Sequence, residues 1–382
     1  MLGGKSTISI KLGQHTVDTA KSEKHLGVLL STSLGCEVEF MKKRILSCKT
    51  ICNGIRSLGS HRVPISPVVA AKLYRTICIP KLCYGAEVMD IGSESLDLME
   101  SYQSTCAKQF IGVPIQCSSP GSVGTMGWQS IEATIDILRM LFLWKILLLD
   151  TTNIYKRAAI CRFFQIVYKG YGKGPMNNII DTFTKHGLFD VLYESIENGE
   201  YMNYQEFKRC AINKVNNVDI KRWKVTCSLY KSLTLLNYRN INKYFPNGWL
   251  VLAHKNPLVI SKVRCIINIL LNTYRLGENV CMLYHGCNYD TAQHILFECD
   301  VGHDERDKMW TSIVLECPTR LAIELSDMSN SSKIKFILNA MNCDYIDEWY
   351  ELYMSMCNYV HTVYMSYYNV MLQLKAASEN HT

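Results

Sequence analysis

Nine basic residues lie between Phe40 and Lys81, and the same stretch contains no Asp or Glu. The whole chain of 382 residues has 41 Lys and Arg against 34 Asp and Glu, a formal net charge of +7. Outside the stretch, 32 basic residues stand against 34 acidic ones. The basic character is therefore local, which is typical of a surface that binds a polyanion such as nucleic acid.

Five of these cations are candidates for phosphate contacts: Lys42, Lys49, Arg56, Lys72 and Arg75. The first three are seven residues apart, so on a helix they line up beside one apolar stripe. That stripe consists of Val38, Met41, Ile45, Cys48, Cys52 and Ile55. Contacts of this kind hold a protein in register on nucleic acid without reading its sequence. The alternative is a solvated helix face that binds nothing.

Strands are expected before the basic stretch and helices within it. Residues 6–31 alternate between apolar and polar side chains, which predicts short strands and a hairpin. The stripe at residues 38–55 predicts the first helix. A second helix is expected at residues 66–78, because a serine N-cap is followed there by proline at the first helical position. It should stop before Pro80.

The rest of the chain reads as mainly helical. Residues 94–111 form a third expected helix, and residues 117–127 are rich in Gly, Ser and Pro and predict a loop. An apolar helix is expected at residues 130–149. Its apolar run from Ile135 to Leu149 is too short and too charged to span a bilayer, so the helix should be buried. Residues 150–260 are mostly helical in pattern, and residues 261–276 predict one more helix.

Two short segments resemble parts of a known protein family. They are His25-Leu26-Gly27-Val28 and Ile79-Pro80-Lys81-Leu82-Cys83-Tyr84-Gly85-Ala86-Glu87-Val88. Both are similar to segments of the reverse transcriptase of non-LTR (LINE-type) retrotransposons. The first resembles the Tyr-Leu-Gly-Val-like primer grip, a hairpin that seats the primer 3′ end. The second resembles the Pro-x-Leu-x-Tyr-Gly-x-Glu segment that ends the thumb.

The resemblance implies a role for each segment. The basic helices take the position of the thumb, which lies along the backbone of the template–primer. Tyr84 is expected to pack and Gly85 to allow a close approach, with no catalytic role. His25 departs from the family, where an aromatic residue is usual, and the alternative for this segment is a strand with a glycine in it.

A third similarity lies in a Cys/His segment near the carboxy terminus. The family has a zinc-knuckle-like Cys-x-x-Cys, then Thr-x-x-His, then Cys five residues after the His. The resemblance implies structural zinc bound by Cys281, Cys287, His294 and Cys299, a four-donor set that suits tetrahedral zinc. Tyr284 stands at the usual second-ligand position, so Cys287 or His285 would have to replace it. The alternative is that no metal binds.

The sequence favours a non-catalytic chain. A polymerase of this family holds two metal ions with a palm Asp-Asp pair, and this sequence contains no Asp-Asp dipeptide. Only 24 residues precede His25, too few for fingers and palm. A P-loop, a Gly-x-Ser-x-Gly elbow and a His-Glu-x-x-His motif are also missing. The chain is therefore expected to bind template–primer RNA or DNA without polymerising alone.

The expected setting is intracellular, in nucleus or cytoplasm. We find no apolar signal segment at the start of the sequence. The 17 cysteines occur largely at apolar helix positions, which favours buried reduced thiols. One further tetrapeptide, Lys221-Arg222-Trp223-Lys224, mixes cations with an aromatic ring as single-strand binders do, although ordinary surface is the simpler interpretation.

The expected fold is mainly α, with a small β-hairpin at the N-terminus, a thumb-like helical bundle, a long helical region and a Cys/His knuckle near the C-terminus. These four parts are expected at residues 1–33, 34–116, 117–260 and 261–316, and a helical C-terminal tail is expected at 317–382. The predicted function is that of a retrotransposon-derived reverse transcriptase fragment. The alternatives are an inert transposon remnant, a helical protein–protein interaction module and, last, a zinc-dependent DNA-binding regulator.

Overall fold

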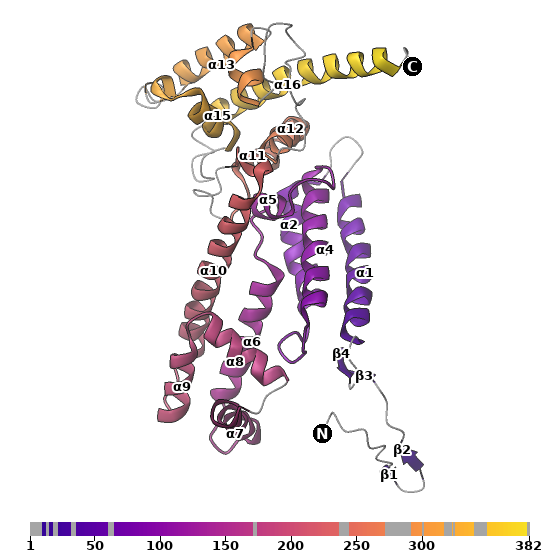
Figure 1. The fold of residues 1–382 in the computed structure, drawn as a ribbon, viewed down its shortest axis with the longest axis vertical. Helices are drawn as coiled ribbons and strands as arrows, with labels where there is room; N and C mark the ends of the chain where they lie inside the picture. The colour runs from indigo at the N-terminus through magenta and orange to yellow at the C-terminus, as the bar shows by residue number, and fades with distance from the viewer. Residues whose placement is uncertain are drawn as a thin grey trace. The chain divides into compact units, whose positions relative to one another are not determined.

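The fold is mainly α-helical with small antiparallel β-hairpins at the N-terminus, as the sequence predicts (Figure 1). The computed structural model describes residues 10–12, 15–17, 22–31, 36–59, 65–170, 174–236, 244–271, 292–299, 302–316, 323, 325–339 and 350–379. Two compact units are interleaved along the chain. The first is Met1–Asn53, Tyr74–Gln103 and Gln129–Arg222; the second is Gly54–Leu73, Ser104–Trp128 and Trp223–Thr382. The five-segment division expected from the sequence stays a prediction.

The first unit begins with two hairpins. Strand β1 (Ile10–Leu12) pairs antiparallel with β2 (His15–Val17), and β3 (Ser22–His25) pairs antiparallel with β4 (Val28–Ser31). The β3–β4 turn places Leu26 at φ 49° and Gly27 at φ 82°. Two central residues with positive φ suit the right-handed twist of the flanking strands in a two-residue hairpin.

Helices make up the rest of the first unit. Three of them, α1 (Cys36–Ser57), α4 (Ser93–Ile111) and α10 (Tyr204–Leu229), continue into the second unit. The others are the π-helical turn η1 (Tyr74–Cys78), α3 (Ile79–Cys83), α6 (Ile131–Leu147), α7 (Ile154–Lys169), α8 (Pro175–Lys185) and α9 (Phe189–Asn198). Ser130 caps α6 by accepting from Ala133 N at 3.2 Å.

An aromatic core joins α6 to α8 and α10. The ring of Trp144 stacks on that of Phe207 with centroids 3.8 Å apart, and Phe207 stacks in turn on Phe183 at 5.9 Å. Trp144 also donates its indole N–H to Met202 O at 3.0 Å, so the buried ring leaves no polar atom without a partner. These contacts fix the part of α10 that lies in the first unit against α6.

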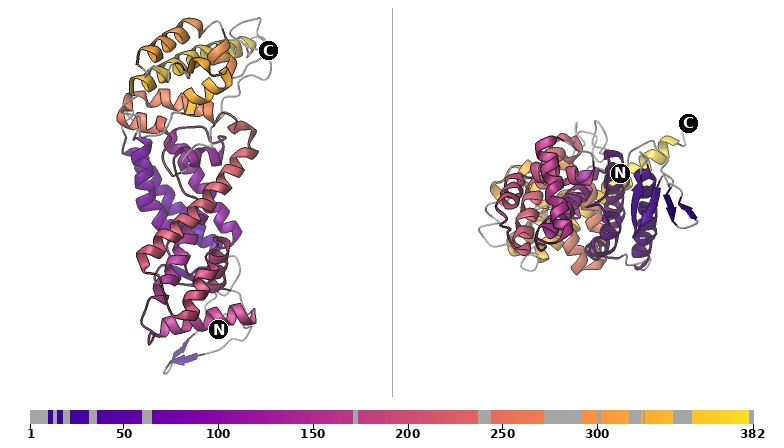
Figure 2. Two further views of the ribbon diagram at one scale, coloured as in Figure 1. Left: turned by 90° about the vertical axis from the view of Figure 1, so that its left-hand side faces the viewer. Right: turned by 90° about the horizontal axis from the view of Figure 1, so that it is seen from below.

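The second unit is also helical. Its own helices are α2 (Pro67–Leu73), α5 (Ser119–Thr125), η2 (Lys231–Leu233), α11 (Gly248–Lys255), η3 (Pro257–Val259), α12 (Ile260–Leu270), the π-helical turn η4 (His294–Glu298), α13 (His303–Glu316), α15 (Asn330–Asn339) and α16 (Tyr350–Glu379). Helix α16 contacts both α12 and α13, and the orange and yellow ribbons of Figure 2 show this group packed together. Trp249 is fully buried there and donates to Leu338 O at 2.6 Å.

One expected loop is a helix. The Gly, Ser and Pro content of residues 117–127 predicts an irregular segment, but Ser119–Thr125 form α5. Ser118 caps it by accepting from Gly121 N at 3.3 Å. A Cβ on Gly124 would overlap the Trp223 ring. The glycine therefore serves close helix packing, a use that composition does not distinguish from loop flexibility.

The expected stop before Pro80 is also wrong. The α-helix of α2 passes into η1 and then into α3, whose first turn contains Pro80. Pro80 has no N–H to donate, and it comes directly after the π-helical turn, where the α-helical hydrogen-bond pattern is already interrupted. Within the described residues, no helix is long and apolar enough to cross a membrane.

Candidate nucleic-acid interface

Helix α1 confirms the predicted division between an apolar stripe and a cationic margin. All six stripe residues are buried: Val38, Met41, Ile45, Cys48, Cys52 and Ile55. Lys42, Lys49 and Arg56 are exposed on the same helix. The seven-residue spacing thus leaves these cations in solvent while the apolar face packs. Binding of phosphate by them stays a prediction.

Lys42 differs from the other two because it has an acidic neighbour on its own helix. Its ammonium lies 2.8 Å from the carboxylate of Glu39, one turn earlier. The hydrogen bond and charge of Glu39 raise the pKa of Lys42 and keep it protonated. Both side chains are more than half exposed, so the pair contributes little to stability. It nevertheless reduces the positive field that Lys42 offers to a phosphate.

The second predicted pair lies on either side of a change in helix type. Lys72 ends the α-helical part of α2, whereas Arg75 is in the π-helical turn η1. Both side chains are exposed. A π turn takes more residues than an α turn, so α-helical spacing does not extend from Lys72 to Arg75. Their shared face, expected from a spacing of three, stays a prediction.

Arg44 has a structural role that differs from that of the other cations of α1, because its guanidinium binds three backbone carbonyls. It donates to Tyr84 O at 2.6 Å, to Leu82 O at 3.3 Å and to Gly27 O at 2.9 Å. Its guanidinium carbon also lies 4.4 Å from the centre of the Phe40 ring, a cation–π contact. One side chain of α1 therefore joins the β3–β4 turn to the end of α3.

The two segments that resemble the reverse transcriptase family contact each other at this point. Tyr84 donates its hydroxyl to Leu26 O at 3.1 Å. A Cβ on Gly85 would lie 2.6 Å from a methyl carbon of Val28. The close approach expected of Gly85 is confirmed, whereas the Tyr84 ring is 55% exposed and packs only in part. At the turn itself, His25 and Leu26 are exposed and Leu26 is 79% accessible.

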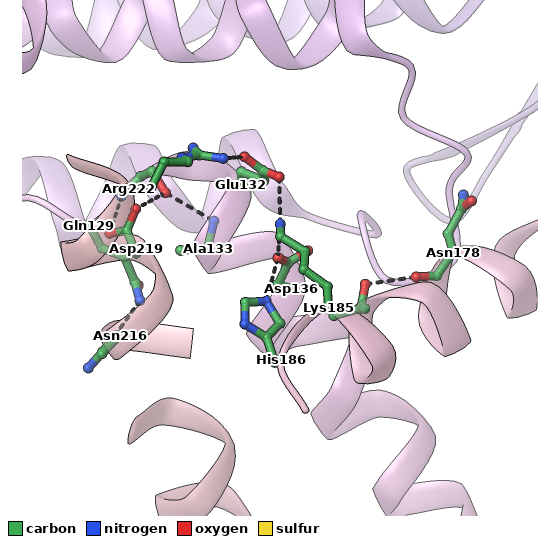
Figure 3. Close-up of polar contacts among 12 residues, drawn as sticks. Gln129, Glu132, Ala133, Asp136, Asn178, Lys185, His186, Asn216, Asp219 and Arg222 are labelled. Carbon is green, nitrogen blue, oxygen red and sulfur yellow. Dashed lines mark hydrogen bonds and ion pairs between the residues drawn. The ribbon is translucent and has the colours of Figure 1, made fainter. Parts of the chain in front are cut away.

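A cluster of charged side chains joins α6, α8 and α10 (Figure 3). Asp136 accepts from Lys185 at 2.7 Å, and His186 Nε2 lies 2.8 Å from the same carboxylate oxygen. Lys185 also bonds Glu132 at 2.5 Å, and Arg222 donates to the other oxygen of Glu132. Charges alternate along the chain of contacts, so each carboxylate is neutralised.

The cluster lowers the pKa of both carboxyl groups. Burial by itself would raise the pKa of Asp136, but the bonds from His186 and Lys185 outweigh it and the pKa falls below its usual 3.8. For Glu132, burial again raises the pKa, and Lys185 and Arg222 together bring it below 4.5. The side chains of Asp136 and His186 are only 4% and 2% exposed. The pair is thus too buried to act on a substrate and stabilises the fold.

A second set of polar contacts fixes α10 to the start of α6. Asp219 accepts from the Ser130 hydroxyl at 2.7 Å, and Gln129 donates its amide to Asn216 at 2.8 Å. Asp219 is 5% exposed, so its charge points into the protein. Neither these contacts nor the charged cluster that joins α6, α8 and α10 was predicted from the sequence. The available signal was Glu132 and Asp136, two carboxylates four residues apart on one side of a mostly apolar helix.

Most cysteines in the described part of the chain are buried, as predicted, whereas Cys161 is exposed. Cys48, Cys52 and Cys78 are buried, with the Cys52 and Cys78 sulfurs 3.7 Å apart and Cys52 3.0 Å from the Tyr102 hydroxyl. None of the cysteines in the described part of the chain forms a disulfide. The spacing of Cys48 and Cys52 thus reflects core packing, as expected.

The predicted zinc ligands are only partly described. Cys281 and Cys287 lie outside the described residues. His294 and Cys299 are buried at the two ends of η4, where Cys299 N donates to His294 O at 2.8 Å. Where the structure is described, no group of three or more His, Cys, Asp or Glu could hold a metal ion. Two donors fall short of a tetrahedral site, so zinc binding stays a prediction.

Comparison of the chain with protein-family models, with curated proteins and with solved structures finds no match. Function is therefore inferred from the residues and their geometry.

Proposed function

We propose that this chain binds nucleic acid through its phosphate backbone, using exposed cations of α1, α2 and η1. The main support is α1 itself. Its apolar stripe is buried while Lys49 and Arg56 face solvent, and residues 40–81 contain no acidic side chain. A cationic surface of this kind attracts a polyanion and releases its counterions.

The proposed context is the primer grip, thumb and carboxy-terminal region of a LINE-type reverse transcriptase. Its support is the contact between the two segments that carry the resemblance. Arg44 bonds the carbonyls of Gly27 and Tyr84, and Gly85 meets Val28. A hairpin that seats a primer end would need such an attachment to α1, the helix proposed to lie along the nucleic-acid backbone. Structural zinc held by Cys281, Cys287, His294 and Cys299 belongs to the same proposal.

The test is binding of a fluorescent RNA/DNA primer–template duplex, measured by anisotropy at about 50 and about 200 mM salt. The three α1 contacts by themselves predict a loss of affinity of roughly 40-fold over this range. The variant K42A/K49A/R56A should bind more weakly and depend less on salt. Equal binding by wild type and variant, or no binding by either, would contradict the proposal and favour an inert remnant or a protein-interaction module.

A further inference from the structure

A second basic region, longer than the first, begins inside α10. Residues 207–277 contain thirteen Lys and Arg and a single acidic residue, Asp219. The tetrapeptide at residues 221–224 is only a small part of it. Such an imbalance over 71 residues is unusual in a chain whose net charge is +7. Within this region, the structure shows where the charges of α10 lie.

Helix α10 separates its residues into two faces. The buried face repeats every four residues: Phe207, Ala211, Val215, Asp219, Trp223 and Cys227. Away from it, the exposed residues of α10 in the first unit include three cations and two amides that face solvent: Arg209, Asn213, Lys214, Asn217 and Lys221. We call these five residues the α10 face. From Arg209 to Lys221 it extends about 18 Å along the helix, enough to reach several phosphates.

The acidic residues near the α10 face are engaged elsewhere. Asp219 turns inward and accepts from Ser130 at 2.7 Å. Glu132 accepts from Lys185 at 2.5 Å and from Arg222 (Figure 3). Glu206 lies in the first helical turn, where the dipole favours a carboxylate, and it accepts from Asn203. Lys214 and Lys221 are therefore left with no acidic neighbour on the helix surface between them.

We infer that the α10 face is a second phosphate-contacting surface for nucleic acid. Lys and Arg would neutralise phosphates, and the Asn amides would donate to phosphate or sugar oxygens, as these residue types commonly do. The ligand, nucleic acid, is the same as in the proposed function, but the residues are different. An experiment can therefore contradict the α10 face without contradicting the α1 site, and the reverse.

An anionic membrane fits the α10 face less well. A helix that lies on a bilayer inserts an apolar face beneath its cations. The apolar residues of α10 within the first unit, such as Phe207 and Val215, are already buried in the protein. The residues exposed over the same section are polar or charged. Anionic lipid vesicles thus serve as a comparison ligand in the test.

The experiment compares R209A/K214A/K221A with wild type on the primer–template duplex across a salt series. For every phosphate that the variant no longer neutralises, the slope of log affinity against log salt should fall by about 0.7 to 0.9. A matched control, R157A/R162A/K169A, removes the same charge from α7. That helix packs through Phe163 and Tyr168 on α9, whose acids Asp190, Glu194 and Glu197 should repel a polyanion.

We expect the α10 variant to bind at least tenfold more weakly at low salt with a shallower slope, while the control matches wild type. Equal weakening by the control would mean that only net charge matters and would overturn the inference. So would an unchanged α10 variant, or wild-type binding to phosphatidylserine vesicles that the α10 variant loses to the same extent. If K42A/K49A/R56A weakens binding and the α10 variant does not, this inference fails while the proposed function stands. The reverse pattern would contradict the proposed α1 site alone.

Discussion

Helices α1 and α10 are both long and rich in cations, yet they bury different residues. The interior face of α1 is apolar and contains the thiols Cys48 and Cys52 beside Met41. The interior face of α10 contains a charge, Asp219, between Val215 and Trp223. An apolar stripe only requires that its neighbours be apolar, whereas a buried carboxylate requires specific donors.

Each of the two helices also uses a cation for internal attachment. In α1, Arg44 bonds three backbone carbonyls, while in α10 Arg222 pairs with Glu132 in the charged cluster. The remaining exposed cations, such as Lys49 and Lys214, are the ones left for a ligand. The number of Lys and Arg in a sequence therefore overstates the positive charge that a surface presents. Substitutions in the two helices can measure what each attachment contributes to stability and binding.

The largest effect is expected from Asp136, which joins α6 directly to Lys185 and His186. Replacing it by alanine leaves His186 without its carboxylate in a buried site and should lower the free energy of unfolding by about 3 to 5 kcal/mol. Urea denaturation followed by circular dichroism measures this. Asp181→Ala, an exposed position on α8, is the control and should change stability by less than about 0.5 kcal/mol. Similar losses in both variants would refute the role of the cluster.

A smaller effect is expected at Arg44. Arg44→Met keeps much of the packing volume but leaves the carbonyls of Gly27, Leu82 and Tyr84 without their donor. Since part of this site is solvated, we expect a loss of about 1.5 to 3 kcal/mol. Lys43→Met, at an exposed neighbouring position, should stay within about 0.5 kcal/mol of wild type. If the two variants unfold alike, Arg44 does not attach the hairpin.

Acid should weaken the charged cluster of the first unit. The folded-state pKa values of Asp136 and Glu132 lie below their ordinary values of 3.8 and 4.5. The unfolded chain therefore binds protons first, so this stabilisation is complete above the ordinary values and is lost as pH falls through the lowered ones. Urea midpoints at about pH 7 and about pH 3 should differ less in Asp136→Asn than in wild type. An equal difference in both would exclude Asp136 as a source of the pH dependence.

The smallest effect is expected on binding at the start of α1. Glu39→Gln frees Lys42 from its carboxylate partner and should raise affinity for the duplex about two- to fivefold, in line with the weak energy of an exposed ion pair. Anisotropy at low salt measures this change. Glu316→Gln removes one exposed negative charge from α13 and should have no comparable effect. Unchanged affinity in Glu39→Gln would indicate that Lys42 does not contact phosphate.

The sequence by itself determined features that depend on local spacing. The α1 stripe, the helix expected at residues 130–149 and the exposure of Lys49 and Arg56 follow from helical periodicity over a few residues. The close approach at Gly85 was also foreseeable from the motif that contains it. The helix at Ser119–Thr125 was not, because its glycines are explained only by the Trp223 ring packed against Gly124.

Only the tertiary structure decided which charges are used inside the protein. Asp136 meets His186 fifty residues later, and Arg44 meets Tyr84 forty residues later. No local pattern marks such partners, because they are brought together by packing between helices that are distant in sequence. The inward turn of Asp219 has the same origin, and it leaves Lys214 and Lys221 as the cations that α10 offers to solvent.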